Sequence, residues 1–127
     1  METLKILFIG DICGALGRKA AAALVPGLRT EFGLDLVVAN GENAAHGKGL
    51  TAKTADELFA AGIDWLTTGD HCFDQAAAID DCYGGARNII RPANYSADAP
   101  GRGFAIIPTS HGDVLLMNLI GRVFMPR

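Results

Sequence analysis

Residues 4–11, with the sequence LKILFIGD, form a short apolar run that ends in a glycine and an aspartate. The same arrangement returns at residues 34–42, LDLVVANGE, and at residues 63–71, IDWLTTGDH. Short apolar runs bounded by turn residues are typical of buried strands in a mostly parallel sheet. The three segments therefore predict three parallel strands, each followed directly by a polar side chain.

The segments between these runs predict helices. Residues 18–32 are rich in alanine and leucine, which favour a helix, although Pro26 is expected to kink or interrupt it near its middle. Residues 51–61 predict a second helix, because Thr51 is a good amino-terminal cap. A weaker helix is expected around residues 74–82. The repeated order of strand, helix and strand predicts an α/β fold.

The last third of the sequence changes character. A short fourth strand is expected at residues 88–90, followed by a loop rich in proline and glycine at residues 92–103. Residues 104–107 and 114–119 then predict two strands that are joined by a polar turn at residues 110–113. The fold class is thus a mostly parallel sheet with helices that ends in a β-hairpin, and the hairpin forms either a second sheet or an antiparallel edge.

Composition narrows the class of protein. The chain has 127 residues, of which 50% are hydrophobic and 20% charged, as expected for one globular domain. Its formal net charge of -3 provides no basic stripe, so general binding to a nucleic-acid backbone is not expected. The apolar run before Asp11 is too short for a signal peptide or a membrane span, which predicts a cytoplasmic protein without a membrane partner.

The cysteines do not indicate a disulfide framework or a cysteine-based zinc site. They are Cys13, Cys72 and Cys82, an odd number without a closely spaced pair. Reduced thiols are therefore expected. Cys13 and Cys72 stand close to polar residues of interest, and we expect both to be small buried core residues.

Polar side chains follow the three predicted strands. They are Asp11 after the first strand, Glu42 and Asn43 after the second, and Asp70 and His71 after the third. The carboxyl ends of parallel strands meet at one edge of the sheet, where open α/β proteins bind ligands. Carboxylates placed this close repel one another unless a cation lies between them. The oxygen donors suit manganese, magnesium or iron, and a glutamate can bridge two ions, so the pattern predicts a metal site.

These polar residues also have interpretations that do not involve a metal site. Aspartate, asparagine and glycine are common in turns after strands, and each position alone favours that interpretation. Three glycine–acid pairs at three strand ends favour the site. Residues 41–50, GENAAHGKGL, lack the spacing of a nucleotide P-loop, and Asp11 would repel a pyrophosphate at the first turn. His46 is interpreted as a positional loop residue, with contact to substrate as the alternative.

Five segments, LFIGDICGALGR, NGENAAHGKGL, TTGDHCFD, RPANY and NLIGRVFM, together resemble the YmdB family of calcineurin-like metallophosphoesterases. The resemblance runs nearly end to end. It implies a metallophosphoesterase-type αββα sandwich, of which residues 1–127 are the amino-terminal part of a single domain and the carboxy-terminal half is absent. Cys13 and Glu42 depart from the wider superfamily in ways that this family shares or tolerates. Asp70 stands where the family has asparagine.

The resemblance also implies roles for the polar residues. Asp11 would bind the first metal, Glu42 would bridge both, and Asn43 and Asp70 would bind the second. His71 would protonate the leaving oxygen or stabilise the transition state. The implied reaction is hydrolysis of a phosphodiester, with 2',3'-cyclic nucleotides as a substrate class and two divalent or trivalent ions, iron or manganese, as cofactors. The extra charge of Asp70 could tighten metal binding while repelling an anionic substrate.

Two classes of function therefore compete. The first is a phosphodiesterase represented by its amino-terminal half and inactive or nearly so alone, because the family's remaining ligands are histidines from the second half; His111 is not assigned as one. The alternative is a non-catalytic module that binds a nucleotide, a metal or a partner. A Rossmann-like fold without an active site is the plainest interpretation. An exposed apolar face would favour a partner or a homo-oligomer.

Overall fold

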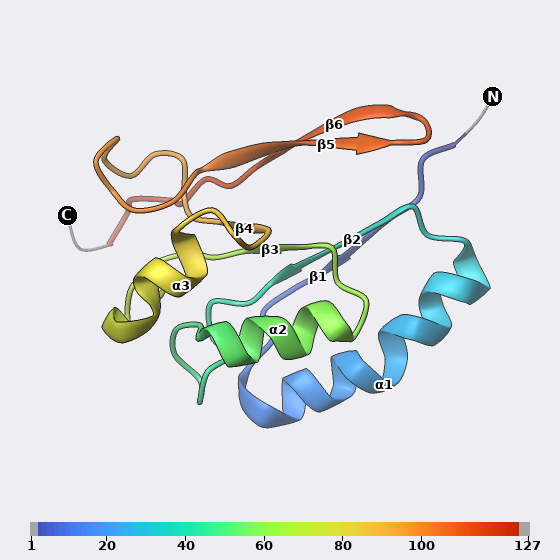
Figure 1. Ribbon diagram of the computed structural model, residues 1–127, viewed down its shortest axis with the longest axis horizontal. Coiled ribbons are helices and arrows are strands. Elements are labelled where there is room, and N and C mark those ends of the chain that lie inside the picture. The colour runs from blue at the N-terminus through green and yellow to red at the C-terminus, as the bar shows by residue number, and fades with distance from the viewer. Residues whose placement is uncertain (1–2, 125–127) are drawn as a thin grey trace.

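The protein is described by a computed structural model over residues 3–124 (Figure 1). Strands and helices alternate through the first part of the chain, as the sequence predicts. The elements are β1 (Ile6–Ile9), α1 (Gly14–Phe32), β2 (Leu36–Asn40), α2 (Ala52–Ala60), β3 (Trp65–Thr67), the 3-10 turn η1 (Ala76–Ala78), α3 (Ile79–Tyr83), β4 (Ile89–Ile90), β5 (Phe104–Thr109) and β6 (Gly112–Met117).

The strands form two sheets. The first four strands make a parallel sheet in the order β1-β2-β3-β4, and β5 and β6 make a separate antiparallel sheet. Figure 1 shows α1 and α2 on one side of the parallel sheet and the hairpin across the other side. The predicted α/β fold with a closing hairpin is confirmed, and the hairpin is a second sheet rather than an edge of the first.

Each face of the parallel sheet has its own core. Because side chains alternate along a strand, β2 sends Val37 and Ala39 to the helices and Leu36 and Val38 to the hairpin. Burial on both faces explains why the strand sequences are continuously apolar. The hairpin-side core consists of Leu36, Val38, Trp65, Ile90, Ala105 and Ile107.

Pro26 does not interrupt α1, which is one helix from Gly14 to Phe32, so the predicted break is wrong. Val25, 1% exposed, anchors the helix beside the proline, while Ala22 and Pro26 face solvent. The carbonyl of Ala22, which would accept from the missing proline N–H, can therefore be hydrated. The third predicted helix is shorter than expected, because the 3-10 turn η1 replaces its start.

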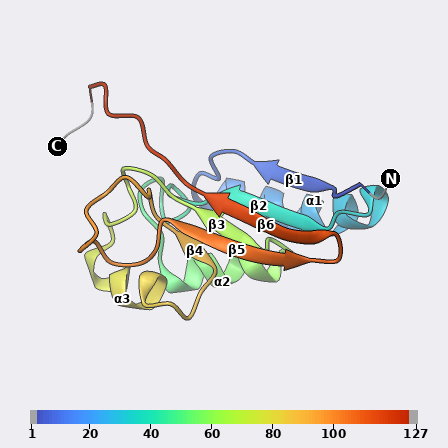
Figure 2. The same cartoon turned by 90° about the horizontal axis from the view of Figure 1, so that it is seen from above.

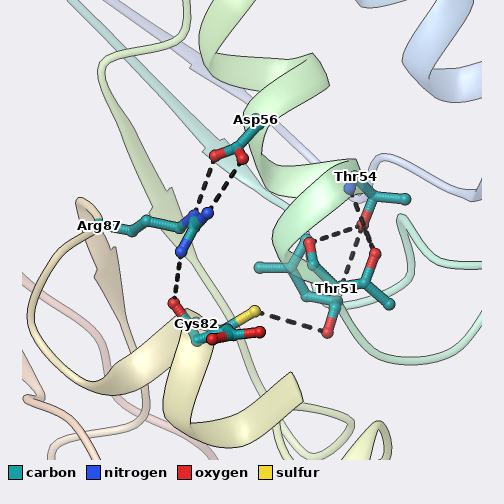
Figure 3. A network of polar contacts seen from close by, with 7 residues as sticks. Thr51, Thr54, Asp56, Cys82 and Arg87 are labelled. Atoms are coloured by element: carbon teal, nitrogen blue, oxygen red, sulfur yellow. Dashed lines mark hydrogen bonds and ion pairs between the residues drawn. The ribbon is translucent and has the colours of Figure 1, made fainter. Parts of the chain in front are cut away.

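Arg87, which precedes β4, forms hydrogen bonds with both α2 and α3 (Figure 3). Arg87 donates two hydrogen bonds to the Asp56 carboxylate, at 2.9 and 3.0 Å, and a third to the carbonyl of Asp81 at 2.7 Å. The hydrogen bond from Arg87 lowers the pKa of Asp56. These contacts hold α2, α3 and the start of β4 together.

Within residues 3–124 we find no helix with the length and apolar character that a membrane span requires.

The amino end of α2 is closed by a reciprocal pair of threonines (Figure 3). Thr51 Oγ1 accepts from the Thr54 amide at 3.2 Å, and Thr54 Oγ1 accepts from the Thr51 amide at 3.0 Å. We expect Thr51→Ala to lower the free energy of unfolding by about 1 kcal/mol, because the cap is lost. Urea unfolding measures this, with Thr30→Ala on exposed α1 as the control. Equal losses in the two variants would contradict the capping role.

Candidate functional site

The structure brings the predicted polar residues to one edge of the parallel sheet. The first connection is a backbone hydrogen bond from the Ile12 amide to the Asn40 carbonyl, at 3.0 Å, which holds the end of β1 against the end of β2. The second runs from the Gly41 amide to the Thr67 carbonyl, at 2.9 Å, and holds the end of β2 against β3. The three strand ends therefore lie side by side at one edge of the sheet.

Asp11 and Asn43 form one group at this edge. Asn43 Nδ2 donates to Asp11 Oδ1 at 2.8 Å, and the Gly14 amide donates to the Asn43 carbonyl at 2.9 Å. Asn43 Oδ1 is buried and has no hydrogen-bond partner. A buried acceptor without a partner is costly, so this atom calls for an ordered water or an ion. An amide oxygen beside a carboxylate suits a hard cation.

Glu42 reaches from β2 across to the segment after β3. Its Oε1 accepts from Asn40 Nδ2 at 3.1 Å, and its Oε2 accepts from the His71 amide at 3.2 Å. Gly69 makes room for the carboxylate, since a Cβ atom there would lie 2.5 Å from both of its oxygens. Glu42 is therefore fixed between the second and third strand ends.

His71 is oriented by a carboxylate that the sequence analysis did not assign. His71 Nδ1 lies 2.7 Å from Asp74 Oδ2, and His71 Nε2 lies 3.8 Å from Asp70 Oδ2. A proton on Nδ1 shared with Asp74 leaves Nε2 as the atom that exchanges a proton with a ligand. The spacing of three residues between His71 and Asp74 is the signal that could have identified this orienting group.

A cavity of about 430 Å³ opens beside Glu42 and Asp70, and residues 118–121 form its other wall. Asn118 connects this wall to the sheet, because its Nδ2 donates to the carbonyl of Thr68 and its carbonyl accepts from the Ala93 amide at 2.8 Å. The site is thus built between the two sheets. Asn118 was also absent from the sequence-predicted site.

Other predicted positions fall outside this arrangement. His46 is exposed and has a positive φ of 52°. Cys72 is buried as expected, and burial raises the pKa of its thiol to about 11. Cys13 is exposed, so the prediction of a buried residue is wrong there. Its place as the residue just before α1, at the turn beside Gly47, explains the exposure.

The oxygen donors at this edge do not form a complete metal shell. Among residues 3–124, no three side chains of histidine, cysteine, aspartate or glutamate are grouped closely enough to hold a metal ion by themselves. The oxygens available at this edge are those of Asp11 and Asn43, which contact each other, and the carboxylates of Glu42 and Asp70. The buried, unpartnered Asn43 Oδ1 fits a cation, whereas a complete shell needs further ligands.

The fold and this edge together define an α/β protein similar to a phosphatase of known structure. That structure, described as a novel phosphatase from Mycoplasma pneumoniae, superposes with a TM-score of 0.88 at 29% identity and covers 95% of this chain and 44% of its own. A hypothetical protein from Thermus thermophilus gives a TM-score of 0.89 at 35% identity, over 96% of this chain and 47% of its own. The chain belongs to the YmdB-like protein family, whose sequence profile matches residues 7–127.

Curated relatives carry enzyme names. A 2',3'-cyclic-nucleotide 2'-phosphodiesterase from Bacillus subtilis strain 168 is 40% identical over 123 residues, which are 97% of this chain and 46% of the relative. A putative phosphatase/phosphodiesterase from Mycoplasma genitalium is 32% identical over 125 residues, which are 95% of this chain and 44% of the relative. The chain therefore spans slightly less than half the length of the curated relatives it matches.

Proposed function

We propose that this chain carries part of the active site of a metal-dependent phosphodiesterase that acts on 2',3'-cyclic nucleotides. The observation that carries the proposal is the buried, unpartnered Asn43 Oδ1 beside the Asp11 carboxylate, at the edge where Glu42 also ends. The name of the Bacillus subtilis relative supports the substrate class. We further propose that the chain is the amino-terminal part of one domain, whose other half completes the shell.

The proposed ligands divide along the edge. Asp11 serves the first ion, Glu42 reaches both, and Asn43 and Asp70 serve the second, with iron or manganese as the ions. Glu42 is suited to this role because Asn40 and the His71 amide each donate to one of its two oxygens and so orient the carboxylate. Asn43 would offer Oδ1 to the ion, since that oxygen has no hydrogen-bond partner and Nδ2 is bound to Asp11.

His71 is proposed to handle the proton of the leaving group. Asp74 fixes the ring through Nδ1, so Nε2 can donate to the oxygen of the phosphodiester that departs. Bound ions would supply positive charge for the phosphoryl oxygens and a more acidic attacking water. Asp70 Oδ2, 3.8 Å from Nε2, adds negative charge beside this proton donor. That charge favours a bound cation and disfavours an anionic substrate in its absence.

Measurements of metal binding distinguish the proposed metal ligands from the proposed proton donor. We expect Asp11→Ala and Glu42→Ala each to lower manganese content after loading, because each removes a carboxylate ligand, by about 10-fold or more in affinity. His71→Ala is the matched control at the same edge and is expected to keep its metal while any hydrolysis is lost. The metal content is measured by elemental analysis after gel filtration. Equal metal content in the three variants would contradict the assignment.

A non-catalytic binding module is the second candidate, and the incomplete shell in residues 3–124 favours it. Such a module would bind manganese or a nucleotide without turnover. The discriminating measurement is hydrolysis of a 2',3'-cyclic nucleotide and of a chromogenic diester by the manganese-loaded chain. Stoichiometric metal with turnover supports the enzyme, and stoichiometric metal without turnover supports the module or a half that needs its complement.

A further inference from the structure

The charged side chains that line the cavity beside the strand ends are acidic. Glu42 and Asp70 contribute two carboxylates, and among the described residues no lysine, arginine or histidine belongs to the lining. The facing wall includes the apolar side chains of Leu119 and Val123. An anion that enters this cavity therefore meets negative charge, which a bound cation would have to offset.

The two carboxylates differ in how their charge is compensated. Glu42 accepts hydrogen bonds from Asn40 and from the His71 amide, which orient it. The Asp70 carboxylate accepts no hydrogen bond among the described residues, its side chain is 45% exposed, and its Oδ2 lies 3.8 Å from His71 Nε2. Asp70 therefore presents its charge beside the proposed proton donor.

A phosphodiester that reacts here has to come close to Asp70. The oxygen that leaves phosphorus must reach His71 Nε2 to receive its proton. Because that oxygen is bonded to phosphorus, the phosphoryl group is brought toward Asp70 Oδ2 at the same time. The charge of Asp70 then acts directly on the charge of the bound phosphoryl group.

The proposed reaction changes that phosphoryl charge. A 2',3'-cyclic phosphate is a diester with one ionisable oxygen, so its charge is about -1. Hydrolysis adds water, breaks one ester bond and returns that ester oxygen to the ribose as a hydroxyl group, which leaves a monoester. The second proton of a phosphomonoester has a pKa of about 6, so the product carries a charge of about -1.5 to -2 at about pH 7. A carboxylate beside phosphorus therefore repels the product more than the substrate.

We propose that Asp70 sets the charge selectivity of this site: it shifts binding toward phosphodiester monoanions and against phosphomonoester dianions, and so favours release of the product. This inference deepens the proposed function and rests on it. Two unit charges about 4 Å apart in surroundings like water change an affinity by about 5-fold, and a dianion carries one unit more than a monoanion. The value for water applies because Asp70 is partly exposed.

Two probes of similar size separate charge from shape. At about pH 8, methyl phosphate is a dianion and dimethyl phosphate is a monoanion. Their affinities are measured from the phosphorus-31 relaxation that bound manganese enhances, with the chain in excess over the metal so that the ion is bound. Asp70→Asn is expected to raise the affinity for methyl phosphate, relative to that for dimethyl phosphate, by at least about 5-fold, because the amide keeps the size and removes the charge.

Two further variants distinguish charge from packing and from net charge. Asp70→Glu keeps the charge, so its ratio of the two affinities is expected to stay close to that of the wild type. Asp113→Asn removes the same charge at the start of β6, at the turn of the hairpin. Figure 2 shows this turn at the opposite end of the hairpin from the segment that follows β6 and forms the cavity wall. The ratio is expected to be unchanged in Asp113→Asn.

The outcomes separate this inference from the proposed function. An equal ratio in Asp70→Asn and the wild type would overturn the charge selectivity even if manganese binds, and an equal change in Asp113→Asn would assign the effect to net charge. If the wild type holds no manganese, the proposed function fails. The affinities are then measured from the shift of the His71 amide in the metal-free chain, where the same change of ratio is expected. Absence of binding of either probe, with and without manganese, would also overturn the inference.

Discussion

Replacing Gly69 by alanine is expected to reduce manganese affinity by about 100-fold while leaving the fold intact. The new Cβ would lie 2.5 Å from both Glu42 carboxylate oxygens and 2.8 Å from Glu42 Cδ, so the two groups cannot keep their places. The carboxylate is the end of a flexible side chain and moves more easily than the backbone. Glu42 would therefore leave the position proposed for the bridging ligand, and loss of a ligand or its orienting contacts costs 10- to 100-fold or more in affinity.

Two measurements detect the displacement of the Glu42 carboxylate in Gly69→Ala. Metal affinity is measured by calorimetric titration with manganese, and hydrogen exchange at the His71 amide reports whether its 3.2 Å contact with Glu42 Oε2 is lost. Gly10→Ala is the matched control, because Gly10 precedes Asp11 at the end of β1 and a Cβ there meets nothing within 4 Å. Unchanged affinity in Gly69→Ala, together with faster exchange at His71, would remove Glu42 from the metal site.

The strand ends could be predicted from the sequence because the signals are local. Asp11, Glu42 and Asp70 each follow a glycine that ends an apolar run, and parallel strands must bring such positions to one edge. The two faces of the sheet could be predicted in the same way. The order of the strands follows from short right-handed crossovers, each of which packs its helix on the same side.

The remaining features depend on contacts that no local pattern contains. Asn118 meets the Thr68 carbonyl across 50 positions of sequence, and only the docking of the hairpin on the parallel sheet sets that contact. Asp74 differs, since its spacing from His71 was visible and only its role was missed. Pro26 shows how tertiary packing decides a local conflict, because burial of Val25 keeps α1 continuous at that point.

The contacts that could not be predicted from the sequence also join the two sheets. Asn118 accepts from the Ala93 amide at 2.8 Å, and its own amide donates to the Gly103 carbonyl at 3.1 Å. Arg91, 6% exposed, donates to the carbonyls of Pro92, Ala99 and Pro100 and so closes the loop between β4 and β5. The cavity wall at residues 118–121 therefore depends on the packing of this loop as much as on β6.

Gly103→Ala is expected to be the most destabilising of the substitutions considered, with a loss of about 3 kcal/mol or more in the free energy of unfolding. A Cβ at Gly103 would overlap the backbone of Ala93, at 2.9 Å from its nitrogen, and lie 2.5 Å from its Cβ. Backbone atoms cannot relieve the overlap by a change of rotamer, as a side chain can. Relief would pull residues 91–93 away from the hairpin and break two backbone hydrogen bonds, from the Arg91 amide to the Arg102 carbonyl and from the Ala93 amide to the Asn118 carbonyl, each worth about 1 kcal/mol.

Urea unfolding followed by Trp65 fluorescence measures this loss, and Gly27→Ala is the control. Both substitutions restrict the unfolded chain alike, so their difference isolates the contact in the folded state. A Cβ at Gly27 meets nothing within 4 Å inside α1, and alanine there is expected to raise stability by up to about 1 kcal/mol. Since domains are stable by only about 5–15 kcal/mol, a loss of this size at Gly103 is readily measured. Similar stability in the two variants would mean that the loop and the hairpin separate without cost, and the cavity wall would then not be fixed by this contact.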